Sequence, residues 1–131
     1  MATIGDILAR RWPGAQWTMT EDDYSSLRWM AGGEPPAEQD IRAFSAEVDV
    51  LMARERMVVT PMQFRLALDG AGLLDACEAA VAAAPRAVQI AWNFAVAIER
   101  LSPQVAQFSG QLNITPEQVD AVFEAAAQIG A

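Results

Sequence analysis

Three of the chain's four tryptophans and its only tyrosine lie within residues 12–40, a segment too short to enclose them. In two runs, residues 15–20 and 27–30, successive side chains alternate between two faces, with Trp17 and Trp29 each on an apolar face, and acidic and serine residues lie between the runs. This pattern predicts a β-hairpin with a long loop. Because a lone hairpin is only marginally stable in water, its aromatic face must pack on helices or on another protein.

A short helix is expected before the hairpin and a linker after it. Thr3 followed by Asp6 has the spacing of a capping box, and the helix it starts should end near Arg11, before Pro13-Gly14. Gly32-Gly33 and Pro35-Pro36 form the linker. Residues 1–36 are therefore predicted to hold an N-terminal helix, an aromatic hairpin and a Pro-Pro linker.

The next segment, residues 37–59, is predicted to be an amphipathic connecting helix. Ile41, Phe44, Val48 and Leu51 repeat with helical spacing, which favours one helix from about residue 37 to residue 57. Two heptads are too few for an independent coiled coil, so we expect a packed surface helix. The sequence leaves self-association open.

Residues 60–131 are predicted to form a C-terminal helical domain. Thr60-Pro61, Ser102-Pro103 and Thr115-Pro116 each place a hydroxyl cap before a proline at the first helical position. The predicted helices cover residues 61–69, 73–84, 86–101, 103–109 and 116–129. The expected fold class is mainly α, with a small N-terminal β-hairpin followed by a compact bundle of short helices.

The helix predicted at residues 86–101 is apolar on most of its sides. Such a helix is typically central in its domain. We therefore expect Trp92→Ala to cost about 3–5 kcal/mol of stability, as for a large core truncation.

Charge and hydropathy limit the partners of the chain. The net charge is −8, and the nine basic residues are all arginine and mostly scattered, so nucleic acid is not expected. The charge-free stretches are shorter than a membrane span, and Arg10-Arg11 follow the first apolar residues, the reverse of a secretory signal. These features predict a soluble protein folded in a cytoplasm.

No residue pattern indicates catalysis, a metal or a cofactor. Cys77 has no histidine to activate it and shares an apolar face with Leu74, so we expect a buried thiol. Residues 21–23 lack the ligand spacing of a calcium loop and are expected to form a solvated turn. Glu117, Asp120 and Glu124 share a face of the last predicted helix, which we expect to face solvent. The chain is not expected to be an enzyme.

With catalysis not indicated, the expected role is recognition of another protein, and the candidate contact residues lie in the hairpin and the linker. Trp17, Tyr24, Trp29 and Met30, with Pro35 of the linker, have the composition favoured in interface hot spots. The alternative is that the aromatic residues close the core of the hairpin. The double substitution of Tyr24 and Trp29 by alanine should separate the two interpretations, because only an interface role leaves folding intact.

The residues that carry this hairpin also resemble a known group of proteins. Residues 12–17, 23–29 and 35–38 are similar to a module of small proteins encoded beside tail-fibre genes in tailed phages and prophages, in which a Tyr-x-x-Leu/Ile-x-Trp pattern precedes prolines and a helix. Tyr24, Leu27 and Trp29 fill that pattern. Residues 60–63 and 113–127 are similar to the ends of short phage proteins from the same gene neighbourhood.

The resemblance implies a structural accessory protein of a phage tail that binds a tail-fibre or baseplate protein and is located in the virion tail. The alternative is a fibre-assembly chaperone that stays in the host cytoplasm and is absent from the mature particle. A third hypothesis is a small inhibitor that presents its acidic face to a basic partner.

Overall fold

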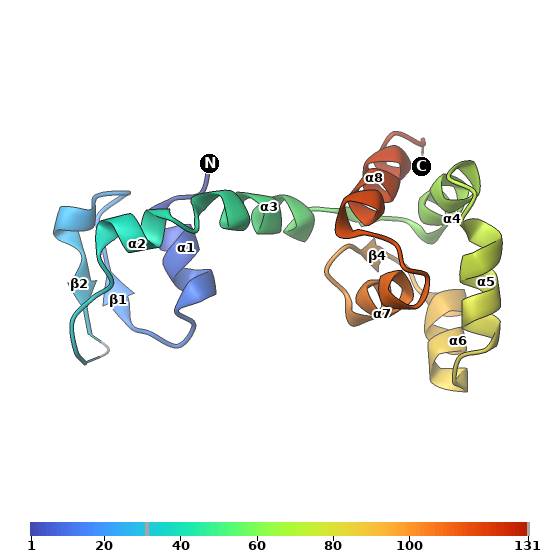
Figure 1. The fold of residues 1–131 in the computed structure, drawn as a ribbon, viewed down its shortest axis with the longest axis horizontal. Coiled ribbons are helices and arrows are strands. Elements are labelled where there is room, and N and C mark those ends of the chain that lie inside the picture. Colours follow the sequence, from blue (N-terminus) through green and yellow to red (C-terminus); the bar gives the residue numbers. More distant parts are fainter. Residues whose placement is uncertain (31, 131) are drawn as a thin grey trace. The chain divides into compact units, whose positions relative to one another are not determined.

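The computed structural model describes residues 1–30 and 32–130, and its contacts divide the chain into unit 1 (Met1–Ala53) and unit 2 (Arg54–Ala131). The protein is mainly helical with a small antiparallel hairpin near its N-terminus, which confirms the predicted fold class (Figure 1). Each unit has its own hydrophobic core.

Unit 1 begins with α1 (Ile4–Arg11), which starts at the predicted cap. The Thr3 hydroxyl accepts a hydrogen bond from the Asp6 amide, and the Asp6 carboxylate accepts one from the Thr3 amide. This arrangement satisfies two backbone donors at the helix start. Ile7 and Leu8 of α1 are fully buried and supply much of the unit 1 core.

The predicted hairpin is present and packs on this core. Strand β1 (Trp17–Thr18) pairs antiparallel with β2 (Arg28–Trp29), with Trp17 opposite Trp29. The loop between them contains one 3₁₀ turn, η1 (Tyr24–Ser26). The apolar faces of both alternating runs pack against the core of unit 1, so the hairpin is supported by helices of the same chain.

The single helix predicted for residues 37–57 is wrong, because the chain forms two helices there. Helix α2 (Glu38–Arg42) and helix α3 (Ser45–Glu55) are separated by a turn, in which the Phe44 amide bonds the Ile41 carbonyl. The turn leaves Phe44 in edge-to-face contact with Trp12, with 5.9 Å between the ring centroids. Tertiary packing of an aromatic ring thus accompanies the break in helical periodicity.

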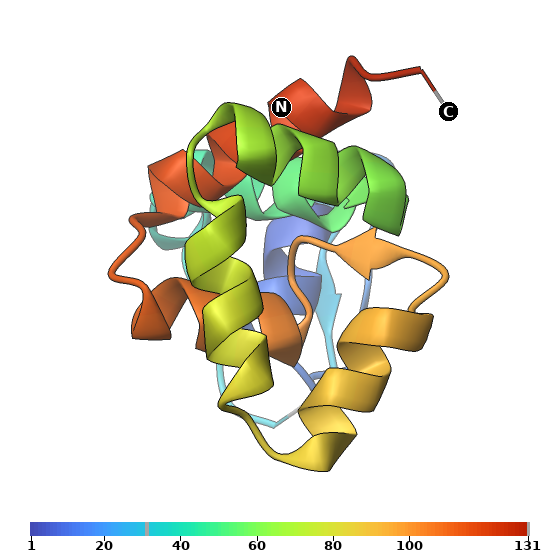
Figure 2. The ribbon, with the colours of Figure 1, turned by 90° about the vertical axis from the view of Figure 1, so that its right-hand side faces the viewer.

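Within residues 54–130, five helices of unit 2 pack around one core. They are α4 (Pro61–Gly70), α5 (Leu74–Ala82), α6 (Arg86–Phe94), α7 (Pro103–Gln111) and α8 (Pro116–Ala127). Helices α4 and α8 lie side by side, while α5 and α6 form a hairpin joined at Pro85 (Figure 2). The predicted caps at Thr60, Ser102 and Thr115 all accept hydrogen bonds from the amides three residues on.

The helix predicted at residues 86–101 is also wrong in its extent. Helix α6 ends at Phe94, and Ile98–Glu99 form strand β4, which pairs antiparallel with β3 (Val58–Val59). β-branched residues favour extended structure when a partner strand is available. That partner lies about forty residues earlier in the chain, so the local pattern did not reveal it.

Helix α6 is not the central helix of the domain. None of its residues is fully buried, and Ile90 and Phe94 are 52% and 78% exposed. The centre of unit 2 is formed instead by Phe64 of α4 and Phe123 of α8, whose ring centroids are 5.2 Å apart. None of the described helices has the length and apolar character needed to cross a membrane.

Candidate functional site: an apolar groove and an aromatic hairpin

The aromatic residues predicted to contact a partner are half-buried in unit 1. Trp17, Tyr24 and Trp29 all pack against its core. Trp17 lies so close to α1 that a Cβ on Gly5 would come within 3.3 Å of its ring. Glycine therefore permits the close approach of helix and indole. For these three side chains, the contacts favour the interpretation that they close the core.

The other two predicted contact residues are exposed. Met30 is 57% exposed, and Pro35 also faces solvent. The Tyr24 hydroxyl donates a hydrogen bond of 2.6 Å to the carbonyl of Pro36, which ties the Pro-Pro segment to the hairpin loop. The structure therefore offers Met30 and Pro35 as the accessible part of the predicted surface, with the aromatic rings as their support.

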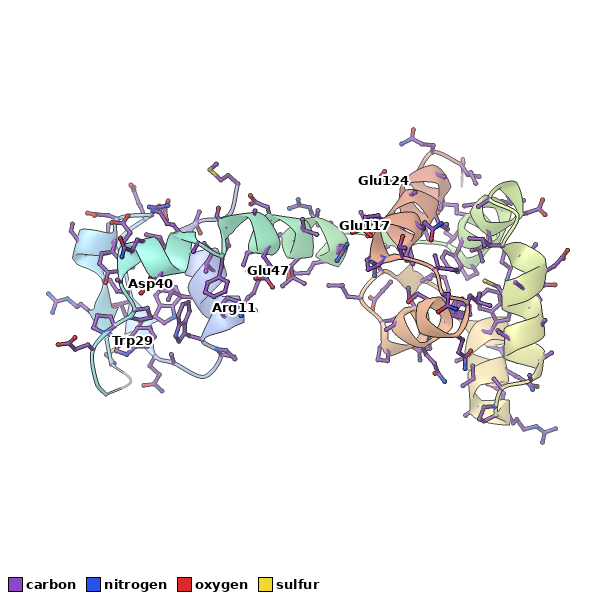
Figure 3. All side chains as sticks on the ribbon, viewed as in Figure 1. Arg11, Trp29, Asp40, Glu47, Glu117 and Glu124 are labelled. Atoms are coloured by element: carbon purple, nitrogen blue, oxygen red, sulfur yellow. The ribbon has the colours of Figure 1, made fainter. Side chains whose placement is uncertain are left out.

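Acidic residues of unit 1 hold its elements together. Asp22 in the hairpin loop accepts a 2.7 Å hydrogen bond from the Ile4 amide at the start of α1, and it pairs with Arg42 of α2 at 3.7 Å. Arg11 of α1 pairs with Glu47 of α3 at 3.5 Å, and the two side chains point toward one another in Figure 3. The loop at residues 21–23 is thus exposed, as expected, but Asp22 also ties it to both helices.

The prediction that the acidic face of α8 is only a solvated surface is wrong for Asp120. Its carboxylate accepts hydrogen bonds from Arg54 and Arg100, with closest N···O distances of 2.8 Å to each. Arg100, only 9% exposed, also donates to the Pro116 carbonyl at the start of α8. Glu117 and Glu124 remain exposed on the same helix (Figure 3). The spacing of arginines in the sequence does not reveal this cluster, because both come from other elements.

Burial and charge act in opposite directions on Asp120. Burial alone would raise the pKa of its carboxyl, but the hydrogen bonds and charges of the two arginines prevail and lower the pKa below its ordinary value. Asp120 thus ties α8 to the end of α3 through Arg54 and to the end of β4 through Arg100.

The cysteine has the environment predicted for it. Cys77 is fully buried in the core of unit 2. Burial, with a further contribution from the charge of Glu78, raises the pKa of the thiol to about 11. A thiol with this pKa is protonated near neutral pH and therefore a poor nucleophile.

Unit 2 contains an open apolar groove that the sequence did not predict. Its volume is about 430 Å³, within the range of ligand pockets in proteins, and it lies among α5, α6, α7 and β4. The residues that we interpreted as the sides of a central helix line it. They include Val88, Ile90, Trp92, Phe94 and Ile98. The excess of apolar residues was the available signal, but it fits a central helix equally well.

Aromatic packing fixes the inner wall of the groove. The Trp92 ring lies 6.2 Å from Phe64 and 5.7 Å from Phe108, measured between centroids. Arg65 covers another side of this indole at 4.6 Å and donates a hydrogen bond to the Trp92 carbonyl. These contacts hold Trp92 in place at the inner wall of the groove.

The polar groups of the groove lie along its other side. Gln104, Gln107 and Gln111 of α7 line it, and their side-chain amides make no hydrogen bond to any residue that the structure describes. Glu99 is the one charged residue among the groove's described lining. Within residues 1–30 and 32–130, no group of three or more potential metal ligands is arranged to hold an ion. The arrangement suits recognition by apolar contact with a few polar groups for orientation.

A comparison with known protein families, curated proteins and solved structures finds no match to this chain. The expected similarity to phage tail proteins stays a prediction that rests on the hairpin and C-terminal motifs of the sequence.

Proposed function

We propose that the chain is a structural accessory protein of a phage or phage-derived tail and that it binds a tail-fibre or baseplate protein. The observation that carries the binding role is the apolar groove of unit 2, bordered by exposed Ile90 and Phe94. Exposed apolar surface of this kind marks interaction sites in soluble proteins. The likeness of the hairpin and C-terminal segments to phage proteins supports the tail assignment.

Unit 1 provides a second contact surface in this proposal. Its exposed part consists of Met30 and Pro35, and its shape is maintained by Trp17, Tyr24 and Trp29 beneath. Since the three aromatic rings pack on the core, replacing Tyr24 and Trp29 together should destabilise unit 1 as well as remove binding. Substitution of the exposed residues is the cleaner probe of the interface.

Quantitative mass spectrometry of purified particles and of the crude lysate tests the proposal. The chain should be retained in particles at a fixed ratio to a tail protein. Met30→Ser combined with Pro35→Ala should lower that ratio without changing the melting temperature. Val50→Ser, a change at another exposed apolar residue of unit 1, is the matched control and should have no effect.

A fibre-assembly chaperone is the alternative function. It predicts the chain in the lysate, bound to fibre protein, and its absence from mature particles. That result would overturn the structural role and direct the search to a transient complex in the host cytoplasm.

A further inference from the structure

The chemistry of the unit 2 groove defines the kind of ligand it takes. We infer that the groove binds a peptide segment that inserts large apolar side chains and carries a lysine or arginine that pairs with Glu99. This inference rests on the proposed function, because it takes the partner to be a protein. It further specifies the kind of partner segment that is recognised and places its binding site in the unit 2 groove.

The apolar anchors follow from the walls of the groove. Phe94 and Ile90 are exposed at its edge, and Trp92 and Phe108 form its interior. Apolar side chains that enter a 430 Å³ space lined in this way are removed from water together with the walls of the groove, which favours binding. Peptides bound in grooves commonly use two or more such anchors.

The basic residue follows from the charge of the groove. Glu99 makes no ion pair with any residue that the structure describes, and the described lining contains no basic side chain. An acidic segment would be repelled both by Glu99 and by a chain of net charge −8. A lysine or arginine at this position would instead gain a partner, which gives specificity more than affinity.

The glutamines favour a peptide over a wholly apolar ligand. Gln104, Gln107 and Gln111 occur on one side of α7 with helical spacing, and their amides can both donate and accept hydrogen bonds. The backbone of a bound segment offers matching N–H and C=O groups. A lipid tail has no groups that could bond these exposed amides, so they would add nothing to its recognition.

Selection from a random peptide library against the immobilised full-length protein tests the inference. Enriched peptides should combine several large apolar residues with a lysine or arginine. Synthetic copies of these peptides are then measured by fluorescence anisotropy against the protein and its variants. Failure to enrich any peptide, or enrichment of peptides without a basic residue, would overturn the inference.

Variants assign the binding to the groove. Phe94→Ser should weaken binding by about tenfold or more, as for a hot-spot residue, and Glu99→Gln by about two- to fivefold, as for an exposed ion pair. Ile90→Ser provides a second groove variant should Phe94→Ser fail to fold. Leu66→Ser and Glu124→Gln change similar exposed residues of unit 2 outside the groove and should leave binding unaltered. Equal effects from all these changes would contradict the assignment.

The oligomeric state distinguishes a second copy as the occupant. Sedimentation analysis should show the same mass for the protein and for Phe94→Ser. A dimer that Phe94→Ser dissociates would show that another copy of the chain fills the groove and would overturn the inference. Neither experiment uses particles. Failure of peptide binding would therefore overturn the peptide specificity but not the tail assignment. Absence of the chain from particles would overturn the tail assignment but not the peptide specificity.

Discussion

At the scale of single residues, Asp120 accepts hydrogen bonds from two arginines of unit 2. It joins α8 to Arg54 and to the nearly buried Arg100. Asp120→Asn would remove the carboxylate charge that both guanidinium groups bond, so we expect a loss of about 1–3 kcal/mol in unfolding free energy near neutral pH. Urea unfolding of the protein and of the variant would measure this difference in unfolding free energy. Glu124→Gln, at an exposed position of the same helix that is distant from both arginines in the sequence, is the control and should change stability little.

The same interaction predicts a pH dependence. The pKa of Asp120 is lower in the folded protein than in the unfolded chain, whose value is near 3.9. The stabilisation is therefore fully present above the unfolded pKa and is lost as pH falls through the folded pKa. Unfolding curves of the protein and Asp120→Asn should differ at pH 7 and converge as the pH falls below about 4. An unchanged difference at low pH would mean that the carboxylate charge is not responsible.

Gly5 is the residue that sets how closely α1 approaches the hairpin. Gly5→Leu should destabilise unit 1 by about 1–3 kcal/mol, because the added side chain must displace Trp17. Ala9→Leu, at an exposed position of the same helix, is the matched control. The indole signals in NMR spectra would report the displacement, and an unmoved Trp17 signal in Gly5→Leu would refute the contact.

At the scale of elements, the sequence predicted the helix starts and the hairpin better than the middle of unit 2. A cap such as Thr115 with Gln118 involves residues within one helical turn, and the alternation around Trp17 involves a few consecutive residues. Both patterns can therefore be recognised locally in the sequence. The β3–β4 pairing instead depends on Val58 meeting Glu99 across a long stretch of chain. The groove and the Asp120 cluster were missed for the same reason, since each forms only when distant elements pack.

The revised position of α6 changes the expected effects of truncating aromatic residues. Phe123→Ala should cost about 3–5 kcal/mol, because that side chain is 1% exposed in the core. Trp92→Ala should cost less than Phe123→Ala, since the indole is only half-buried, and Phe94→Ala should cost little. Thermal melts of the three variants would give the order of their stability losses. A loss for Trp92→Ala equal to or larger than that for Phe123→Ala would indicate that α6 is central after all.

At the scale of the whole molecule, the two cores imply that the units unfold separately. Three tryptophans lie in unit 1, and Trp92 lies in unit 2. In Phe123→Ala, the Trp92 indole signal should therefore reach its unfolded position at a lower temperature than in the unaltered protein. The signals of Trp12, Trp17 and Trp29 should be unchanged. Simultaneous loss of all four signals would show one cooperative unit instead.

Photo-crosslinking in assembled particles would show whether the chain binds a tail protein through the groove and the hairpin surface. A photoreactive amino acid is placed at Phe94, at Met30 and, as a control, at Glu124, all exposed in the structure. We expect crosslinks to a tail-fibre or baseplate protein from positions 94 and 30 and none from position 124. If particles contain the chain but neither position 94 nor position 30 gives a crosslink, the proposed binding surfaces are wrong.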